Sequence, residues 1–243
     1  MGYTALISAP KGGSDFPDKL QSTVKGKSLL QHTYESVKST ELFDNVIVVT
    51  NDNSIHDLVA SFGGTTHLTT KMYDNIFERM AEATLLSDSE IFVCIPATHL
   101  TLQKEATQKL LQLFDGNFGK DIKVASIVKK IQDPERLNNI DTVKVALSLR
   151  MYGLYFSRAA IPAMKKQETG FSHYEHVNIL AARKDAMLNL LQQPTSPLER
   201  AEQIDCLRFV ENGVPIKLII EKYPTVDIRT TADIAAAEAF LSN

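Results

Sequence analysis

Short apolar runs alternate with amphipathic segments through the first half of the chain. The apolar runs are rich in β-branched residues, which is typical of buried parallel strands; they cover 3–7, 44–50, 65–68, 90–95 and 122–128. Between them, apolar positions recur at spacings of three and four, which predicts helices; these cover 29–37, 54–62, 73–86 and 102–114. This alternation predicts an α/β fold with a mostly parallel sheet and right-handed crossovers.

Two of these helices carry more specific expectations. The first helix should bury one stripe of residues: Leu29, Leu30, Thr33, Tyr34 and Val37. The helix over 73–86 should turn a second stripe inward: Ile76, Met80, Ala83 and Leu86.

The pattern changes near residue 141. Alternating apolar positions over 141–148 are followed by a second strand-like run over 151–157, which predicts an antiparallel hairpin. A strand over 172–182 should return to the sheet, and a helix should cover 184–191. Ser196, Pro197 and Glu199 are a helix-start signal, for a helix that we expect to run to Asn212. A last strand over 216–221 and a closing helix over 231–241 complete the prediction.

Composition narrows the class of protein. With 243 residues the chain can bury a large core, and we expect one domain over 1–243 with the insertion at 141–182. A formal net charge of −3 favours neither a nucleic-acid nor a membrane partner. No long apolar stretch or signal-like segment is visible, so we expect a cytoplasmic protein. Cys94 and Cys206 stand in apolar contexts, which predicts reduced core thiols.

Several segments together resemble one enzyme family. Val143–Val145 and Gly153–Pro162 resemble the pattern V-K-V…A-L-Y-F-S-R-A-x-I-P, and Ser196–Arg208 resembles S-P-L-E-x-x-E-x-L-E-Q-L-R. In the first turn, Ile7, Ala9, Pro17 and Lys19 match I-P-A-R-x-x-S-x-R-x-P-x-K. These are motifs of the CMP-Kdo synthetases, which are sugar-activating cytidylyltransferases. The resemblance implies a Rossmann-like, GT-A-like nucleotidyltransferase fold in which the hairpin insertion forms a homodimer.

The resemblance also implies a chemistry that this chain departs from. Such enzymes transfer a cytidylyl group from CTP, using Mg²⁺ and cationic side chains to balance phosphate charge. Pro10 and Asp15 stand where the first-turn pattern has its two arginines. Thr98 stands where the family has a metal-binding aspartate, and Arg229 falls on the second such position. A slip of that last alignment would offer Asp227 instead.

Other positions keep two interpretations open. Lys19 is either a remaining phosphate contact or a solvated loop lysine. The segment Lys11, Gly12 and Gly13 could cradle an anion through backbone N–H groups, or be a flexible turn. His99 could serve as a ligand or base, or be a partner-binding or merely exposed histidine. His176 falls on the histidine of the family's H-L-G-I-Y-G-Y segment, which implies a former substrate contact.

A further segment departs from the family's S-G-T-E-R, which contacts nucleotide. Here it reads Asn75, Ile76, Phe77, Glu78 and Arg79, so only the last two residues remain. Ile76 and Phe77 make this rim more apolar, which would suit a peptide or an apolar metabolite. The alternative is that both are core residues of their helix.

Two functions follow from these observations. The first is a member of this family that has lost CMP-sugar synthesis and binds a peptide, a protein or a small metabolite, with no cofactor and no metal expected. The second is a divergent nucleotidyltransferase that activates a Kdo-like sugar acid with CTP and Mg²⁺.

Overall fold

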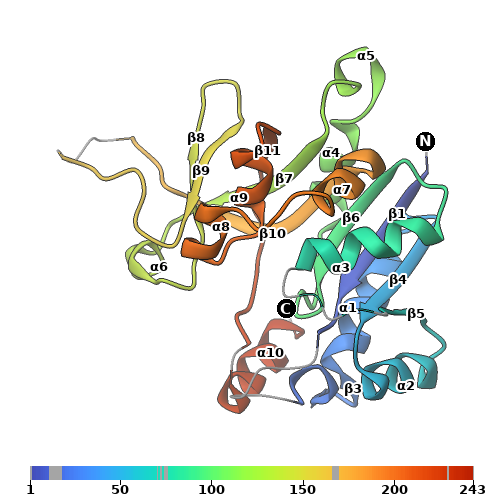
Figure 1. Ribbon diagram of the computed structural model, residues 1–243. Helices are drawn as coiled ribbons and strands as arrows, with labels where there is room; N and C mark the ends of the chain where they lie inside the picture. Colours follow the sequence, from blue (N-terminus) through green and yellow to red (C-terminus); the bar gives the residue numbers. More distant parts are fainter. Residues whose placement is uncertain are drawn as a thin grey trace. The chain divides into compact units, whose positions relative to one another are not determined.

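The computed structural model describes residues 2–10, 18–69, 71, 73, 76–165, 170–228 and 230–242. The chain divides into two compact units, one made of Met1–Lys104 and Pro224–Asn243 and the other of Glu105–Tyr223. The fold is mixed α/β, and in the first unit all the strand pairs of the main sheet are parallel (Figure 1). No helix in the described part of the chain is long and apolar enough to span a bilayer.

The first unit is built on four parallel strands in the order β6-β1-β4-β5. Its strands are β1 (Tyr3–Ser8), β2 (Thr23–Val24), β3 (Lys27–Ser28), β4 (Asn45–Thr50), β5 (Thr65–Leu68) and β6 (Ile91–Pro96). Its helices are η1 (Lys19–Gln21), α1 (Leu29–Ser39), α2 (Asn53–Ser61), α3 (Ile76–Ala83), η2 (Thr84–Leu86), η3 (Thr231–Asp233) and α10 (Ile234–Phe240). The strands and helices predicted for this region are therefore confirmed, with ends shifted by a few residues.

The second unit mixes parallel and antiparallel pairs. Strand β11 (Ile216–Ile220) pairs in parallel with β7 (Val124–Lys130), which pairs antiparallel with β10 (Tyr174–Arg183). The predicted hairpin is β8 (Lys144–Leu147) and β9 (Gly153–Ser157), and β8 also pairs with β10. The helices are α4 (Lys104–Gln112), α5 (Gly116–Gly119), α6 (Pro134–Asn138), α7 (Lys184–Leu190), α8 (Pro197–Glu202) and α9 (Cys206–Glu211).

Buried side chains anchor helix α1 and the closing segment in the core of the first unit. The five residues predicted for the buried stripe of α1 are all buried. Ser28 caps this helix, because its hydroxyl accepts a hydrogen bond from the Gln31 N–H at 3.1 Å. The closing segment packs against the same region, since Ile228 and Ala237 share a core cluster with Leu29 and Leu100.

Two local predictions need correction. The inward stripe of α3 is displaced by one position: Met80 and Ala83 are buried as expected, but Ile76 is 40% exposed and Leu86 55% exposed. Phe77, Ala81 and Thr84 take the buried positions with Met80. The helix predicted from Ser196 to Asn212 is two helices, because Gln203 adopts a left-handed conformation with φ of 54° and ends α8.

Candidate functional site

The carboxyl ends of β1 and β6 meet at one edge of the parallel sheet, where open α/β sheets bind their ligands. Ser8 pairs with Pro96 at the last position of both strands. One residue further, the Ala97 N–H donates to the Ser8 carbonyl over 3.0 Å. This edge is therefore the candidate site of the first unit.

The turn after β6 is fixed by backbone and side-chain hydrogen bonds. The His99 N–H donates to the Pro96 carbonyl, and the buried Thr33 hydroxyl of α1 donates to the Ala97 carbonyl at 2.7 Å. Ala97 is buried, whereas Thr98 and His99 are partly exposed. The turn thus presents the threonine and the histidine at the sheet edge from a rigid base.

Ser8 is a polar residue at this edge that the sequence analysis did not single out. Its side chain is 3% exposed, and in the described part of the chain its hydroxyl makes no hydrogen bond. Pro10 follows two residues later and is partly exposed. The signal that could have identified Ser8 is the family pattern, which has a proline at this position.

The residues of α3 that align with the family's nucleotide-contacting segment differ in how far they are buried. Phe77 is 7% exposed, which favours its interpretation as core, and the neighbouring Ile76 is exposed. Arg79 is 5% exposed, and its Nη2 donates to the Tyr73 carbonyl at 3.0 Å. Glu78 is partly exposed. The buried Arg79 therefore stabilises the segment that precedes α3.

A second polar cluster joins α3 to the end of β5. One Glu82 oxygen lies 3.0 Å from His67 Nε2, and the other accepts a hydrogen bond from the Tyr73 hydroxyl at 2.7 Å. Burial and the Glu82 carboxylate raise the pKa of Tyr73 to about 12. Tyr73 is therefore a neutral hydrogen-bond donor that ties this segment to α3.

Five of the residues proposed for the site lie outside the described residues: Lys11, Gly12, Gly13, Asp15 and Arg229. Lys19 lies in η1 and is partly exposed. Asp227 is exposed, and the neighbouring Ile228 packs in the cluster that contains Leu100. Ile228, just before Arg229, thus shares a core cluster with Leu100, which lies two residues after Thr98.

His176 lies in the second unit, on β10 as predicted. It is buried, and its Nε2 lies 2.7 Å from the Ser126 hydroxyl. Desolvation lowers the pKa of His176 to about 4, although the Asn178 side chain opposes this shift. Asn178 has φ of 62° at a break in the β10 register, where the family segment has glycine. Asparagine tolerates this left-handed conformation, so the strand keeps its shape.

Known proteins match this chain over nearly its full length. The family model for cytidylyltransferases matches residues 4–222. The 3-deoxy-manno-octulosonate cytidylyltransferase of Flavobacterium johnsoniae is 32% identical over 241 residues, covering 99% of each chain. This chain belongs to the cytidylyltransferase family.

Further relatives place it with the CMP-Kdo synthetase type. The 3-deoxy-manno-octulosonate cytidylyltransferase of Christiangramia forsetii is 34% identical over 238 residues, which cover 98% of this chain and 96% of that protein. Among solved structures, a CMP:2-keto-3-deoxy-manno-octonic acid synthetase in complex with CTP matches with a TM-score of 0.90. It is 27% identical, and the match covers 100% of this chain and 99% of that one.

Much of what this chain shares with the cytidylyltransferase motifs is structural. The Lys144 ammonium group is fully buried and donates to the carbonyl oxygens of Asn139, Thr142 and Arg158. Glu202 accepts hydrogen bonds from the Ser157 hydroxyl at 2.6 Å and the Arg158 N–H at 2.9 Å. These contacts hold the hairpin and the loop before it to α8.

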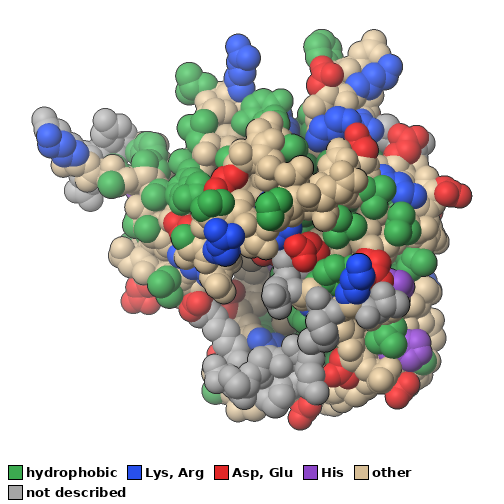
Figure 2. Space-filling view, in the orientation of Figure 1, with side chains coloured by type: hydrophobic (Ala, Val, Ile, Leu, Met, Phe, Trp, Pro, Cys, Tyr) green, Lys and Arg blue, Asp and Glu red, His purple; other side chains and the backbone are tan. Residues whose placement is uncertain are grey.

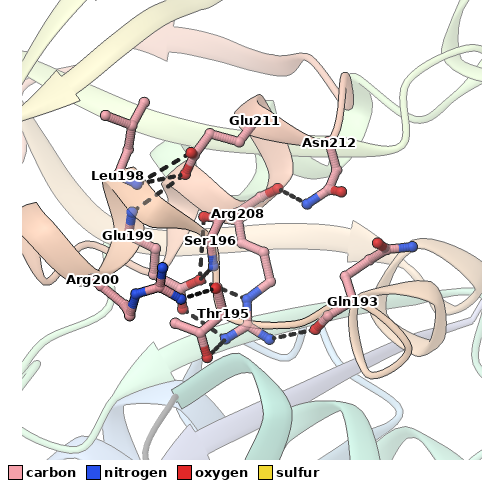
Figure 3. Close-up of polar contacts among 9 residues, drawn as sticks. All are labelled: Gln193, Thr195, Ser196, Leu198, Glu199, Arg200, Arg208, Glu211 and Asn212. Carbon is pink, nitrogen blue, oxygen red and sulfur yellow. Dashed lines mark hydrogen bonds and ion pairs between the residues drawn. The ribbon is translucent and has the colours of Figure 1, made fainter.

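The Ser196–Arg208 motif also serves the fold (Figure 3). Arg208 is fully buried and donates from Nε and Nη2 to the two oxygens of Glu199, at 2.7 and 2.8 Å. Glu199 in turn accepts from the Ser196 N–H at 3.1 Å, which closes the predicted capping box of α8. The motif therefore preserves an architecture and by itself indicates no reaction.

The described residues do not fit the Mg²⁺ that the family implies. Thr98 offers a hydroxyl where the family has a carboxylate, and Mg²⁺ prefers carboxylate oxygens. In the described ranges, no group of three or more His, Cys, Asp or Glu residues could hold a metal ion. Asp227, the alternative ligand from the sequence, is exposed.

Proposed function

We propose that this cytidylyltransferase-family protein has lost CMP-sugar synthesis and acts as a binding protein for a peptide, a protein or a small metabolite. The observation that supports this most directly is the turn after β6. It is held rigidly by Ser8 and Thr33, yet it presents Thr98 where the family presents a metal-binding aspartate.

The charge at the site supports the same proposal. Transfer of a cytidylyl group depends on cations that neutralise phosphate, and losing one such group costs about 10³ or more in rate. Pro10 carries no charge at the first arginine position, and Asp15 would repel a triphosphate at the second. Because these groups act on the same phosphates, none of the losses compensates another.

The retained motifs are consistent with this proposal. The side chains of Lys144, Arg158 and Arg208 all donate hydrogen bonds to protein atoms of the second unit. Selection for the fold is therefore enough to keep them, whether or not the protein turns over CTP.

Binding of nucleotide gives the first test. With Mg²⁺ present, CTP should bind with a dissociation constant weaker than about 1 mM, or about −4 kcal/mol. Isothermal titration calorimetry measures this constant, and a coupled assay for pyrophosphate release with CTP and Kdo measures turnover. The F. johnsoniae relative is the matched control. A micromolar constant together with turnover would contradict the proposal.

One observation favours the second candidate function, a divergent nucleotidyltransferase. Asp227 is exposed beside the core residue Ile228, which packs with Leu100 near Thr98. If Asp227 served as a metal ligand, Asp227→Asn would abolish any turnover found. Under the proposed function, this variant binds CTP as weakly as the wild type does.

A further inference from the structure

Hydroxyl groups stand at both strand ends of the candidate site. Ser8 ends β1 where the family pattern has proline, and Thr98 follows β6 where it has aspartate. The two strand ends are direct neighbours, because Ser8 pairs with Pro96 and accepts from the Ala97 N–H at 3.0 Å. Both substitutions replace a group that cannot donate a hydrogen bond with one that can.

The Ser8 hydroxyl differs in its hydrogen bonding from the Thr4 hydroxyl, which lies on the same face of β1. Alternate residues of a strand share a face, so Thr4 and Ser8 point to the same side of the sheet. The Thr4 hydroxyl is hydrogen-bonded to Ser87 at 3.0 Å and to Ser89 at 2.8 Å. The Ser8 hydroxyl is buried and makes no hydrogen bond within the described residues. An unpaired buried hydroxyl costs a fold free energy, so a ligand that forms a hydrogen bond with Ser8 would recover this cost.

The charges at this edge limit what that partner can be. Hydroxyl oxygens are poor substitutes for the carboxylates that Mg²⁺ prefers. Pro10, two residues beyond Ser8, carries no cation to balance phosphate. An uncharged ligand with its own hydroxyl or amide groups needs neither a metal nor a cation, and it can both donate to and accept from Ser8 and Thr98.

We infer that the ends of β1 and β6 form a site that works without a divalent cation and takes an uncharged, hydroxyl-bearing ligand, with Ser8 as a contact. This inference deepens the proposed function and rests on it. It disagrees with the Mg²⁺-dependent site of the family.

Binding of Mn²⁺, followed by electron paramagnetic resonance, tests the cation without any substrate. The wild type should show no saturable binding below millimolar concentration, and Thr98→Asp should gain it. Saturable binding by the wild type would overturn the inference, as would equal behaviour of the two proteins. This result is separate from turnover: pyrophosphate release from CTP and Kdo without Mn²⁺ binding would contradict only the proposed function.

A series of probes that differ in charge tests the ligand class. Calorimetry with cytidine, CMP and CTP, each without metal, should give affinities that fall in that order. Ser8→Ala should weaken cytidine binding by about threefold to tenfold, the loss of one neutral hydrogen bond. Tighter binding of CTP, unchanged cytidine binding by Ser8→Ala, or no cytidine binding at millimolar concentration would overturn the inference.

Thermal unfolding of the ligand-free protein separates a contact residue from a structural one. Ser8→Ala should leave the melting temperature unchanged or raise it, because it removes an unpaired buried hydroxyl. Thr4→Ala is the control and should lower the melting temperature, because it breaks the hydrogen bonds of the Thr4 hydroxyl with Ser87, Ser89 and Asn45. A decrease for Ser8→Ala as large as that for Thr4→Ala would show that Ser8 serves the fold.

Discussion

Neighbouring residues of α3 occupy opposite environments. Phe77 is 7% exposed and Ile76 is 40% exposed. The sequence showed apolar residues in this helix, but an eight-residue helix with apolar side chains at 76, 77, 80, 81 and 83 is compatible with two adjacent stripes. Contacts with β1 and β4 decide between the stripes, and no local pattern contains that information.

Phe77→Ala should destabilise the protein by about 3–5 kcal/mol, because it leaves a cavity in the core. Ile76→Ala is the matched control and should cost well under half as much, since its side chain is already partly in water. Chemical denaturation of both variants measures the difference. Equal effects would mean that Phe77 is not a core residue.

The buried His176 should make stability depend on pH. Its folded pKa of about 4 lies below its ordinary value of 6.5, so between these values the unfolded chain binds a proton that the folded chain does not. Stability from this residue is therefore complete above pH 6.5 and is lost as the pH falls toward 4. A shift of this size corresponds to roughly 3 kcal/mol.

The measurement is the free energy of unfolding between pH 4 and pH 7 for wild type and His176→Gln. Carboxylates also titrate near the acid end, so the informative quantity is the difference between the two proteins, which should shrink on acidification. A difference that does not vary with pH would show that His176 is not buried in its neutral form.

At the scale of elements, the pair α8 and α9 depends on one ion pair. Arg208→Met leaves the Glu199 carboxylate buried without its cation and should cost about 3–5 kcal/mol. Lys123→Ala, which breaks an exposed pair with Asp185, should cost about 1 kcal/mol or less. Similar losses in urea denaturation would contradict the structural role of Arg208.

The larger elements could be predicted, because their strands are β-branched and the apolar positions of their helices recur at spacings of three and four. The break between α8 and α9 could not. Gln203 adopts a left-handed conformation with φ of 54°, and no glycine in the sequence predicts it. The Arg158 guanidinium donates to the Gln203 carbonyl at 3.0 Å, so the break is stabilised by a residue distant in sequence.

At the scale of the whole molecule, the surface of the second unit carries apolar residues. Figure 2 shows hydrophobic side chains over the region of β8 and β9. Leu149 is fully exposed and Leu154 is 60% exposed. Apolar patches of this kind mark interaction surfaces, and we propose that this hairpin forms a two-fold homodimer.

Light scattering at micromolar concentration should therefore give the mass of a dimer. Leu154→Glu should shift the mass toward that of a monomer, because it places a charge in an apolar interface. Phe118 is 94% exposed on α5, outside the hairpin, so Phe118→Glu should remain dimeric. A monomeric wild type would refute the proposal.

The sequence could reveal the fold and family but only part of the site. Thr98 could be identified from the sequence because the family pattern has an aspartate at that position. The family pattern has a proline where this chain has Ser8, which marks the position as a departure, but the missing hydrogen bond of Ser8 could be found only in the structure.

The Lys144 ammonium and the Arg208 guanidinium are both buried. Selection for a stable fold therefore acts on these two residues. Selection for folding alone is enough to keep such residues, whichever reaction the protein carries out. Percentage identity that rests on them therefore reports ancestry more faithfully than it reports chemistry. Under the proposed function, the residue after β6 distinguishes an active relative from an inactive one better than the shared motifs do.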